Sequence, residues 1–286
     1  MYGYYNKLLK INLTAKNFSE EDILDDVLEK HLGGKGLGAY LMLKEIQPGI
    51  DPLSEKNKLI FTVGPVTGSQ LWGSSRYGVF AKSPLTGIFG ESYSGGKVAP
   101  CIKACGYDAI IIEGKSDRPT YLEITQGKVM FHDASHLWGK DTYQSEDALL
   151  AEVGVPNAQA VVIGPAGENL VRFAVIENDY WRSAGRCGMG AVCGSKKLKG
   201  IVFHGNAKCE FADTDLLKKL IRDLSKKSRE NLRLPAKIWR ERGTVQTVEA
   251  ANNKGCFPTR YWSEGRHEHW ENLNAEYMLE NFEVKC

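Results

Sequence analysis

The chain has 286 residues, 42% of them hydrophobic and 25% charged, and its formal net charge is +2. This composition is that of an ordinary soluble globular protein, and the small net charge points to neither a nucleic acid nor a membrane as partner. No apolar run approaches the roughly 20 residues of a membrane-spanning helix, and the N-terminus lacks the apolar segment of a secretory signal. Seven cysteines without framework spacing favour a reducing, cytoplasmic compartment.

The N-terminal part predicts one strand and two helices. Lys7–Leu13 alternates well enough for a half-buried strand. Ser19 and Asp22 resemble a capping box that opens an amphipathic helix, and Ala39–Ile46 predicts a second helix. Between them, Gly33–Gly38 follows a helix rather than a strand, so we interpret it as a helix–helix turn and not as a dinucleotide-binding loop.

Two later stretches, about residues 58–115 and 159–205, carry the same features in the same order. Each has a Gly-Pro pair, an arginine followed by an aromatic residue, a glycine loop, a lysine and a β-branched run. The predicted strands are Lys58–Val63, Arg76–Ala81, Asp108–Glu113, Gln159–Ile163, Arg172–Ile176 and Gly200–Phe203. Two copies of one unit usually pack about a pseudo-twofold axis, which would bring both glycine loops to a shared cleft.

The remaining regular elements are a hairpin and several helices. The hairpin is predicted from Thr120–Thr125 and Lys128–His132. The predicted helices are Lys97–Cys105, Asp141–Val153, an amphipathic helix after about Asp213, and Asn274–Asn281. Because no long β run follows Asp213, we place a domain boundary near Cys209–Asp213, before an all-α region.

The stretch Asn178–Ser195 is the strongest candidate site, because it holds two arginines among four glycines. Glycine backbone lets successive N–H groups line one concavity, and Arg182 and Arg186 could add bidentate donors to a phosphate held there. The glycines are Gly185, Gly188, Gly190 and Gly194. The alternative is a turn-rich connection with two solvated arginines, and the position of this stretch within the repeat favours the anion site.

Other sequence patterns are weaker candidates for a functional site. The pairs Cys101/Cys105 and Cys187/Cys193 lack the paired spacing of a zinc site and are typical of buried small residues. No Ser-His-Asp or Cys-His set, no acid/base carboxylate pair and no histidine ligand pattern can be assembled. Lys218–Arg242 holds ten Lys/Arg against three Asp/Glu. We interpret it as a solvated helix face, with an acidic partner or nucleic acid as alternatives.

Several runs together resemble the tungsten-containing aldehyde:ferredoxin oxidoreductase family along the whole chain. The matching runs are MYG…INLT, GGKGLGAYLMLKE, DPLSEKNKLIFTVGPVTG, SRYGVFAKSPLTG, SGG, GYDAIIIEGK, DASHLWGK, IGPAGENLVRFAVIENDYWRSAGRCGMGAVCGSKKLKGI and NNKGCFPTRYW. The resemblance implies an α+β fold in which two pseudosymmetric β-rich repeats within residues 1–210 form the base for a tungsten (or molybdenum) bis-pyranopterin. Residues 211–286 would begin an all-α domain.

The resemblance also implies the site residues. Arg76 would sit between the pterin and a [4Fe–4S] cluster, and the backbone carbonyls of Tyr93 and Ser183 would hold a Mg²⁺ that bridges the two pterin phosphates. The phosphate ends would be lined by Ser94, Gly95, Gly96, Arg182, Ser183, Ala184, Gly185, Arg186, Gly188 and Gly190. Two phosphates close together need a dication and clustered donors, so this assignment is chemically consistent.

The chain departs from the family at a few positions. Tyr93 stands where relatives often have Asn, while Cys187 and Cys193 stand where they often have Gly and Met. Family members are considerably longer. The resemblance implies that Cys286 is the first thiolate of the family's [4Fe–4S] motif, Cys-x2-Cys-x3-Cys, with the acid/base residues beyond it.

We therefore expect an N-terminal segment of an enzyme that oxidises an aldehyde to a carboxylic acid and reduces ferredoxin. The partners implied are ferredoxin, a small aldehyde and, as an option, a second copy of the chain. The rival hypothesis is a non-catalytic scaffold, truncated or a split subunit, that binds the pterin phosphates. Because one thiolate cannot hold a [4Fe–4S] cluster, the 286-residue chain alone is expected to be colourless and inactive.

Overall fold

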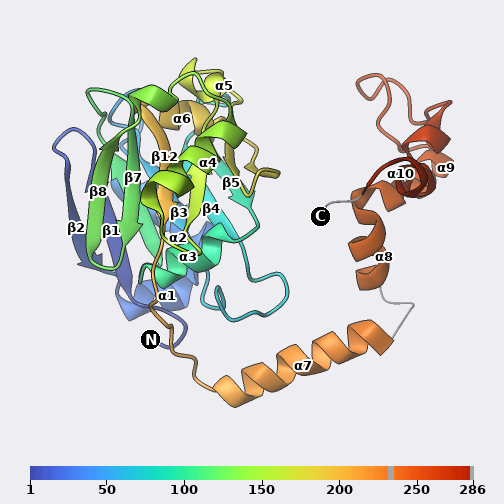
Figure 1. The fold of residues 1–286 in the computed structure, drawn as a ribbon, viewed down its shortest axis with the longest axis horizontal. Coiled ribbons are helices and arrows are strands. Elements are labelled where there is room, and N and C mark those ends of the chain that lie inside the picture. Colours follow the sequence, from blue (N-terminus) through green and yellow to red (C-terminus); the bar gives the residue numbers. More distant parts are fainter. Residues whose placement is uncertain (231–234, 284–286) are drawn as a thin grey trace. The chain divides into compact units, whose positions relative to one another are not determined.

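The computed structural model describes residues 1–230 and 235–283. It divides into two compact units, Met1–Thr214 and Asp215–Cys286. The first unit contains strands β1 to β12, arranged in two six-stranded sheets (Figure 1). In the described part of the second unit the regular elements are helices, and residues 254–269 form turns and irregular backbone with one isolated bridge between Thr259 and Glu264.

The first sheet has the strand order β2-β1-β6-β3-β4-β5. Its strands are β1 (Lys7–Asn12), β2 (Asn17–Asp22), β3 (Leu59–Thr62), β4 (Tyr77–Lys82), β5 (Phe89–Ser94) and β6 (Ala109–Glu113). Strands β1 and β6 run parallel, and the other neighbours run antiparallel. The helices in this part are α1 (Asp25–His31), α2 (Gly34–Glu45) and α3 (Val98–Ala104).

The second sheet has the strand order β11-β10-β9-β12-β7-β8. Its strands are β7 (Thr120–Thr125), β8 (Lys128–Asp133), β9 (Gln159–Val162), β10 (Ile176–Asn178), β11 (Arg182–Ala184) and β12 (Leu198–Phe203). Strands β7 and β12 run parallel, and the other neighbours run antiparallel. The helices are η1 (Ser135–Leu137), α4 (Thr142–Val153), α5 (Pro165–Glu168) and α6 (Met189–Ser195).

Both sheets have the same connectivity. Each begins with an antiparallel hairpin, continues through helices to three antiparallel strands, and returns through a helix to a strand parallel to the hairpin's first strand. The hairpins β1–β2 and β7–β8 lie outside the repeated stretches 58–115 and 159–205. The structural unit is therefore longer than the stretch in which the sequence features recur.

The two sheets pack face to face. One hydrophobic core joins buried side chains of both, among them Phe61, Ile110, Leu122 and Phe203, with residues of α3 and α6. A second core lies between the first sheet and helices α1 and α2, and a third lies between the second sheet and α4. Because β6 is buried on both faces, its sequence is the continuous apolar run Ala109–Ile112 rather than an alternating pattern.

Two predictions near the N-terminus are wrong. The capping box at Ser19 and Asp22 lies in strand β2, whose six residues are all exposed and whose backbone pairs with β1. An edge strand needs only backbone partners, so its polar sequence gave no strand signal. Gly33–Gly38 is not a helix–helix turn, since α2 already begins at Gly34. A Cβ on Gly38 would overlap the Phe80 ring, so this glycine lets α2 pack closely on β4.

The predicted strand Arg172–Ile176 is also largely wrong, because β10 begins only at Ile176. The preceding backbone packs against α6, where a Cβ on Gly188 would overlap the Arg172 carbonyl. Glycines at the start of α6 thus let this segment pack closely against the helix backbone instead of pairing as a strand. The other strands predicted in the repeat and the β7–β8 hairpin are confirmed within one or two residues, whereas β5, β11, α5 and α6 were not predicted.

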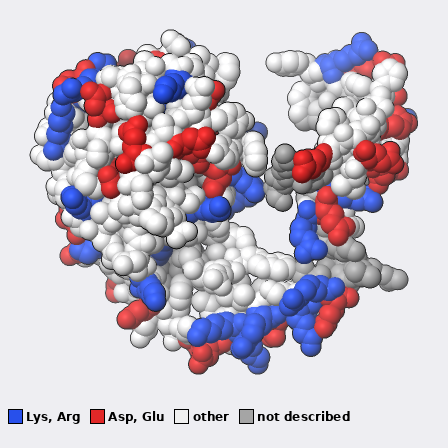
Figure 2. Space-filling model, viewed as in Figure 1, with Lys and Arg blue, Asp and Glu red and all other residues white. Residues whose placement is uncertain are grey.

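The second unit contains six helical segments among the described residues. They are α7 (Thr214–Glu230), α8 (Pro235–Arg242), η2 (Gly243–Thr247), α9 (Val248–Asn253), η3 (Trp270–Leu273) and α10 (Ala275–Asn281). Helices α7 and α10 confirm the helical predictions for this region. Figure 2 shows Lys and Arg side chains gathered along α7. In the part of the chain that the structure describes, no helix combines the length and apolarity needed to cross a membrane.

One lysine is buried without an acidic partner. Lys196 is fully buried, and its Nζ donates to the carbonyls of Glu55 (3.2 Å), Gly114 (3.0 Å) and Asn57. No carboxylate of the described residues forms an ion pair with it. Burial lowers the pKa of Lys196 from an ordinary value of 10.5 to about 8, because the charged form loses its hydration.

This pKa predicts a pH-dependent stability. Between about pH 8 and pH 10 the unfolded chain keeps the Lys196 proton while the folded chain loses it, so folding stability rises with pH in this window. We expect the free energy of unfolding of the wild-type protein, measured relative to that of Lys196→Met, to rise by up to about 1.4 kcal/mol for each unit of increasing pH. Denaturant titrations of both proteins across this window measure the slope. The exposed Lys128→Met should show no such difference from wild type, and a stability difference between wild type and Lys196→Met that does not change with pH would contradict the prediction.

Candidate functional site

Where the two sheets come together, β5, an edge strand of the first, contacts β11, an edge strand of the second. Hydrogen bonds cross between the adjoining segments. The backbone N–H of Arg186 donates to Ser92 Oγ at 3.0 Å, and Ser83 Oγ donates to the Cys187 carbonyl at 2.8 Å. The structure therefore brings together the two predicted glycine loops, which are far apart in the sequence.

On the first sheet, the predicted residues lie at the start of β4 and the end of β5. Arg76 directly precedes β4 and is exposed. A Cβ on Gly95 would lie 3.7 Å from Cζ of Arg76, so the guanidinium lies beside this glycine. Tyr93 is 38% exposed and donates from its hydroxyl to Glu91 at 2.9 Å, while Ser94 and Gly95 are buried. Gly96, with φ +87°, starts the turn into α3.

On the second sheet, β11 presents Arg182 and Ser183 to solvent and buries Ala184. Ser183 Oγ donates to Glu177 Oε1 at 2.7 Å across the β10–β11 pair. Burial raises the pKa of Glu177, and the hydrogen bond from Ser183 partly offsets this rise. Beyond β11, Gly185 and Arg186 are exposed. Three arginine side chains, Arg76, Arg182 and Arg186, thus reach solvent around the edge where the sheets meet.

The four glycines of this stretch differ in environment. Only Gly185 is exposed, whereas Gly188 caps α6 with φ 74° and Gly190 and Gly194 lie inside this helix. A Cβ on Gly190 would overlap the Val175 carbonyl, and one on Gly194 would overlap the Gly167 carbonyl. Close packing therefore explains these glycines without a ligand. The cofactor-binding roles of Gly188 and Gly190 stay predictions.

Of the four cysteines predicted to be buried, Cys105 and Cys193 are buried, whereas Cys101 and Cys187 are only partly buried. Burial raises the pKa of Cys193 to about 12, so its thiol stays protonated and unreactive at neutral pH. In residues 1–230 and 235–283, no group of three or more His, Cys, Asp or Glu side chains could hold a metal ion. The predicted cluster ligand Cys286 lies outside the described residues.

Sequence reasoning missed a group of polar residues behind the exposed arginines. Asn178, Asp179 and Glu146 are bonded to both glycine loops or to the turn between β10 and β11. No motif marks them, because their partners lie 33 to 101 residues away in the sequence. The meeting of the two sheets brings Asn178 and Asp179 against the first glycine loop, while Glu146 reaches the turn from α4, which packs on the second sheet.

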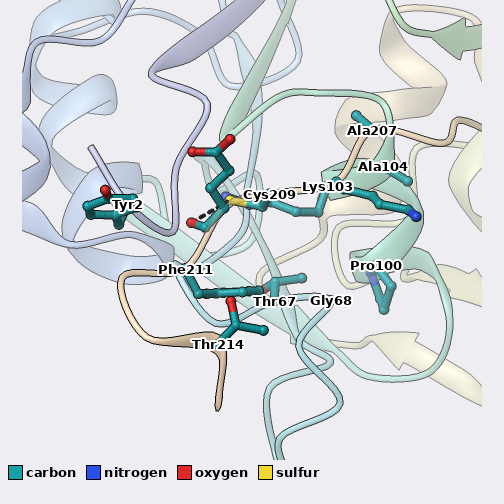
Figure 3. A pocket seen from close by; sticks show the side chains of 12 residues that line it. Tyr2, Thr67, Gly68, Pro100, Lys103, Ala104, Ala207, Cys209, Phe211 and Thr214 are labelled. Atoms are coloured by element: carbon teal, nitrogen blue, oxygen red, sulfur yellow. Dashed lines mark hydrogen bonds between the residues drawn. The ribbon is translucent and has the colours of Figure 1, made fainter. Parts of the chain in front are cut away.

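A separate cavity of about 760 Å³ lies against α3 and is lined by none of the predicted site residues. Figure 3 shows that its walls come from Tyr2, the Thr67–Gly68 loop, α3 and the segment that contains Cys209 and Phe211. Lys103 reaches it from α3, but its ammonium group is already paired with Asp108 and the Gly3 carbonyl. This cavity therefore lies apart from the arginine-lined edge.

The fold consists of two sheets of equal topology, and exposed arginines lie around the edge where these sheets meet. Comparison with known families identifies the chain further. The family model described as "Aldehyde ferredoxin oxidoreductase, N-terminal domain" matches residues 8–205, and the model for domains 2 and 3 of the same enzyme matches residues 219–286. The chain belongs to the aldehyde ferredoxin oxidoreductase family, as its sequence resemblance predicted.

Individual relatives support the same family assignment. The chain is 42% identical to a tungsten-containing aldehyde ferredoxin oxidoreductase of Pyrococcus abyssi, over 98% of this chain and 47% of that protein. It is 41% identical to the protein of the same name from Pyrococcus horikoshii, over 100% of this chain and 47% of that protein. The active-site complex BamBC of benzoyl coenzyme A reductase, solved with 1,5-dienoyl-CoA, has a chain that matches with a TM-score of 0.82 and 29% identity, over 100% of this chain and 46% of that chain. The chain spans about half the length of these relatives.

Proposed function

We propose that this chain binds the phosphate side of a tungsten bis-pyranopterin and belongs to an enzyme that oxidises an aldehyde to a carboxylic acid and reduces ferredoxin. The observation that carries the proposal is that three exposed arginines, Arg76, Arg182 and Arg186, lie on segments that adjoin the edge where β5 and β11 meet. We infer tungsten, an aldehyde substrate and ferredoxin from the names of the relatives, which are tungsten-containing aldehyde ferredoxin oxidoreductases. The free thiols of the six described cysteines fit a reducing, cytoplasmic compartment.

The donor set suits two phosphates. Guanidinium groups bind phosphate through paired N–H donors, and the exposed Gly185 leaves the backbone beside Arg186 open to a ligand. The carbonyls of Tyr93 and Ser183 belong to the two contacting edge strands, so a Mg²⁺ between the phosphates could take one oxygen from each sheet. When bound, the tungsten cofactor would supply the oxygen and electron chemistry, and these residues would hold and orient it.

We further propose that the two sheets are halves related by a pseudo-twofold axis, each supplying one phosphate loop. Their equal strand order and orientation support this. The loops occupy matching places, since one follows β5 and the other includes β11, the corresponding strand. A ligand with two similar phosphate ends fits such a pair of loops better than a ligand with one phosphate end.

The direct test uses the complete enzyme, expressed with tungstate and purified without oxygen. Tungsten, pterin, magnesium and iron are measured per protein, followed by aldehyde-dependent reduction of ferredoxin. Stoichiometric tungsten and pterin with ferredoxin reduction would support the proposal. Protein that binds the pterin but never reduces ferredoxin with any aldehyde would favour the rival scaffold hypothesis, and protein without pterin would overturn both.

Arg76 should affect electron transfer more than cofactor binding. If it lies between the pterin and a [4Fe–4S] cluster, Arg76→Ala removes a positive charge beside a redox centre while the phosphate donors on β11 remain. We expect tungsten content within about twofold of wild type but a lower reduction potential and slower turnover, because a lost cation disfavours the reduced, more negative state. Redox titration and ferredoxin reduction measure this, and unchanged potentials and turnover would remove Arg76 from that position.

A further inference from the structure

A single buried amide connects the two sheets beside the proposed site. Asn178, the last residue of β10, is fully buried. Its Oδ1 accepts from the Tyr77 hydroxyl at 2.8 Å and from Ser94 Oγ at 2.7 Å. Its Nδ2 donates to the Gly95 carbonyl at 3.0 Å and to Asp179 Oδ2 at 2.8 Å. All four hydrogen-bonding positions of the amide are therefore used, three of them by residues of the first sheet or its glycine turn.

The neighbouring turn is held in an unfavourable backbone conformation. Asp179 and Tyr180 have φ values of 48° and 59°, in the left-handed region that suits glycine. Glu146 on α4 accepts the backbone N–H groups of both residues, at 2.9 and 3.1 Å. Glu146 is 5% exposed, and burial, together with the nearby charge of Asp179, raises its pKa. Aspartate tolerates this region but tyrosine does not readily, so the buried Glu146 side chain helps to hold Tyr180 there, and strained residues of this kind cluster at functional sites.

Asp179 also reaches across to the first sheet. Its Oδ2 accepts the backbone N–H of Lys97 at 2.8 Å, just after the glycine turn. A Cβ on Gly96 would overlap this carboxylate, so the loop and the turn fit closely. The contacts of Asp179 and Asn178 therefore fix the turn Ser94–Lys97 against the turn that leads into β11.

We propose that Asn178 and Asp179 are positioning residues that set the spacing between the two phosphate-binding loops. This inference rests on the proposed function. Strands β5 and β11 belong to different sheets, so no shared ladder of backbone hydrogen bonds sets the distance between Tyr93 and Ser183. Mg²⁺ requires near-octahedral geometry with oxygens at about 2.0–2.1 Å, so two carbonyls from separate sheets need a rigid link. The Asn178–Asp179 pair provides that link directly behind them.

The test is Asn178→Asp in the complete holoenzyme. The substitution keeps the shape of the side chain and the oxygen that accepts from Tyr77 and Ser94. It replaces the amide donor with an oxygen that faces the Gly95 carbonyl and the Asp179 carboxylate, which repels both. We expect magnesium and tungsten per folded protein to fall about tenfold, the size of effect typical when a residue that orients metal ligands is changed.

Asn57→Asp is the matched control. Asn57 is also fully buried, its Nδ2 donates to the carbonyls of Pro52 (2.7 Å) and Lys82 (3.0 Å), and its Oδ1 accepts the Lys82 N–H at 3.1 Å. The chemical change is the same, but none of its partners is a proposed site residue. We expect both variants to melt at lower temperature than wild type and only the variant at Asn178 to lose its metals.

The possible results of this test separate failure of the positioning role from failure of the proposed function. Equal metal content in the two variants would overturn the positioning role while leaving the proposed function intact, and a wild-type protein without tungsten or magnesium would overturn both. If Asn178→Asp does not fold, Asp179→Ala serves as the second variant. It removes the oxygen that accepts from both Lys97 and Asn178, so metal content should also fall. Full metal content in Asp179→Ala would then overturn the inference.

Discussion

Replacing Arg182 with Glu should nearly empty the cofactor site of the complete enzyme while leaving the fold intact. Arg182 is exposed on β11, so a charge change there should alter stability by no more than about 0.5 kcal/mol. Two unit charges about 4 Å apart interact by about 4 kcal/mol at an effective dielectric constant of about 20, and the substitution turns attraction into repulsion. Since about 1.4 kcal/mol corresponds to tenfold in binding, we expect at least a tenfold loss of tungsten and pterin.

Arg118→Glu is a suitable control, because it makes the same charge change at the opposite side of the second sheet. Arg118 precedes β7. In the second sheet, the three strands β10, β9 and β12 lie between β7 and β11. Its ion pair with Asp133 is exposed and should contribute little. Metal and pterin analysis of both purified variants decides the matter. Equal occupancy in the two would remove Arg182 from the site.

The sequence predicted the buried strands well because they carry their own signal. Continuous β-branched runs such as Ile110–Ile112 can bury both faces only in the middle of a layered structure. The edge strands β2, β5 and β11 are short or polar, and they are strands only because a neighbour pairs with their backbone. Such pairing depends on residues distant in the chain, which no local pattern records. The edges formed by β5 and β11 carry the proposed site, so its position could be expected only from the repeat and from the resemblance.

The polar network behind the site was invisible for a related reason. Asn178 looks like an ordinary turn residue, and its role depends on Tyr77 and Ser94, which lie 101 and 84 residues away. Glycine presented the opposite difficulty, since the residue type suits both a ligand loop and a close helix contact. The structure separates these uses within one stretch, placing Gly185 on the surface and Gly194 inside α6.

That separation leads to the largest expected effect on stability. Gly194→Ala places a Cβ against the Gly167 carbonyl, and neither helix backbone can move without disturbing the core around α6. Overpacking of this kind costs typically about 1–3 kcal/mol and occasionally more, and we expect the upper end because the obstacle is backbone. Gly185→Ala is the matched change in the same stretch. Its φ is not in the left-handed region, and the nearest atom to the added Cβ would be Ser183 Cβ at 3.6 Å.

The two alanine variants should therefore separate folding from binding. Denaturant unfolding should show Gly194→Ala destabilised by about 3 kcal/mol, with Gly185→Ala within about 1 kcal/mol of wild type. If the exposed backbone at Gly185 approaches a pterin phosphate, its alanine variant should keep its fold and lose cofactor, since a methyl group would occupy the space of the ligand. Metal content at wild-type level in Gly185→Ala would confine the site to the arginines and the β5 loop. Wild-type stability in Gly194→Ala would mean that α6 and α5 pack less closely than the overlap of Gly194 with the Gly167 carbonyl requires.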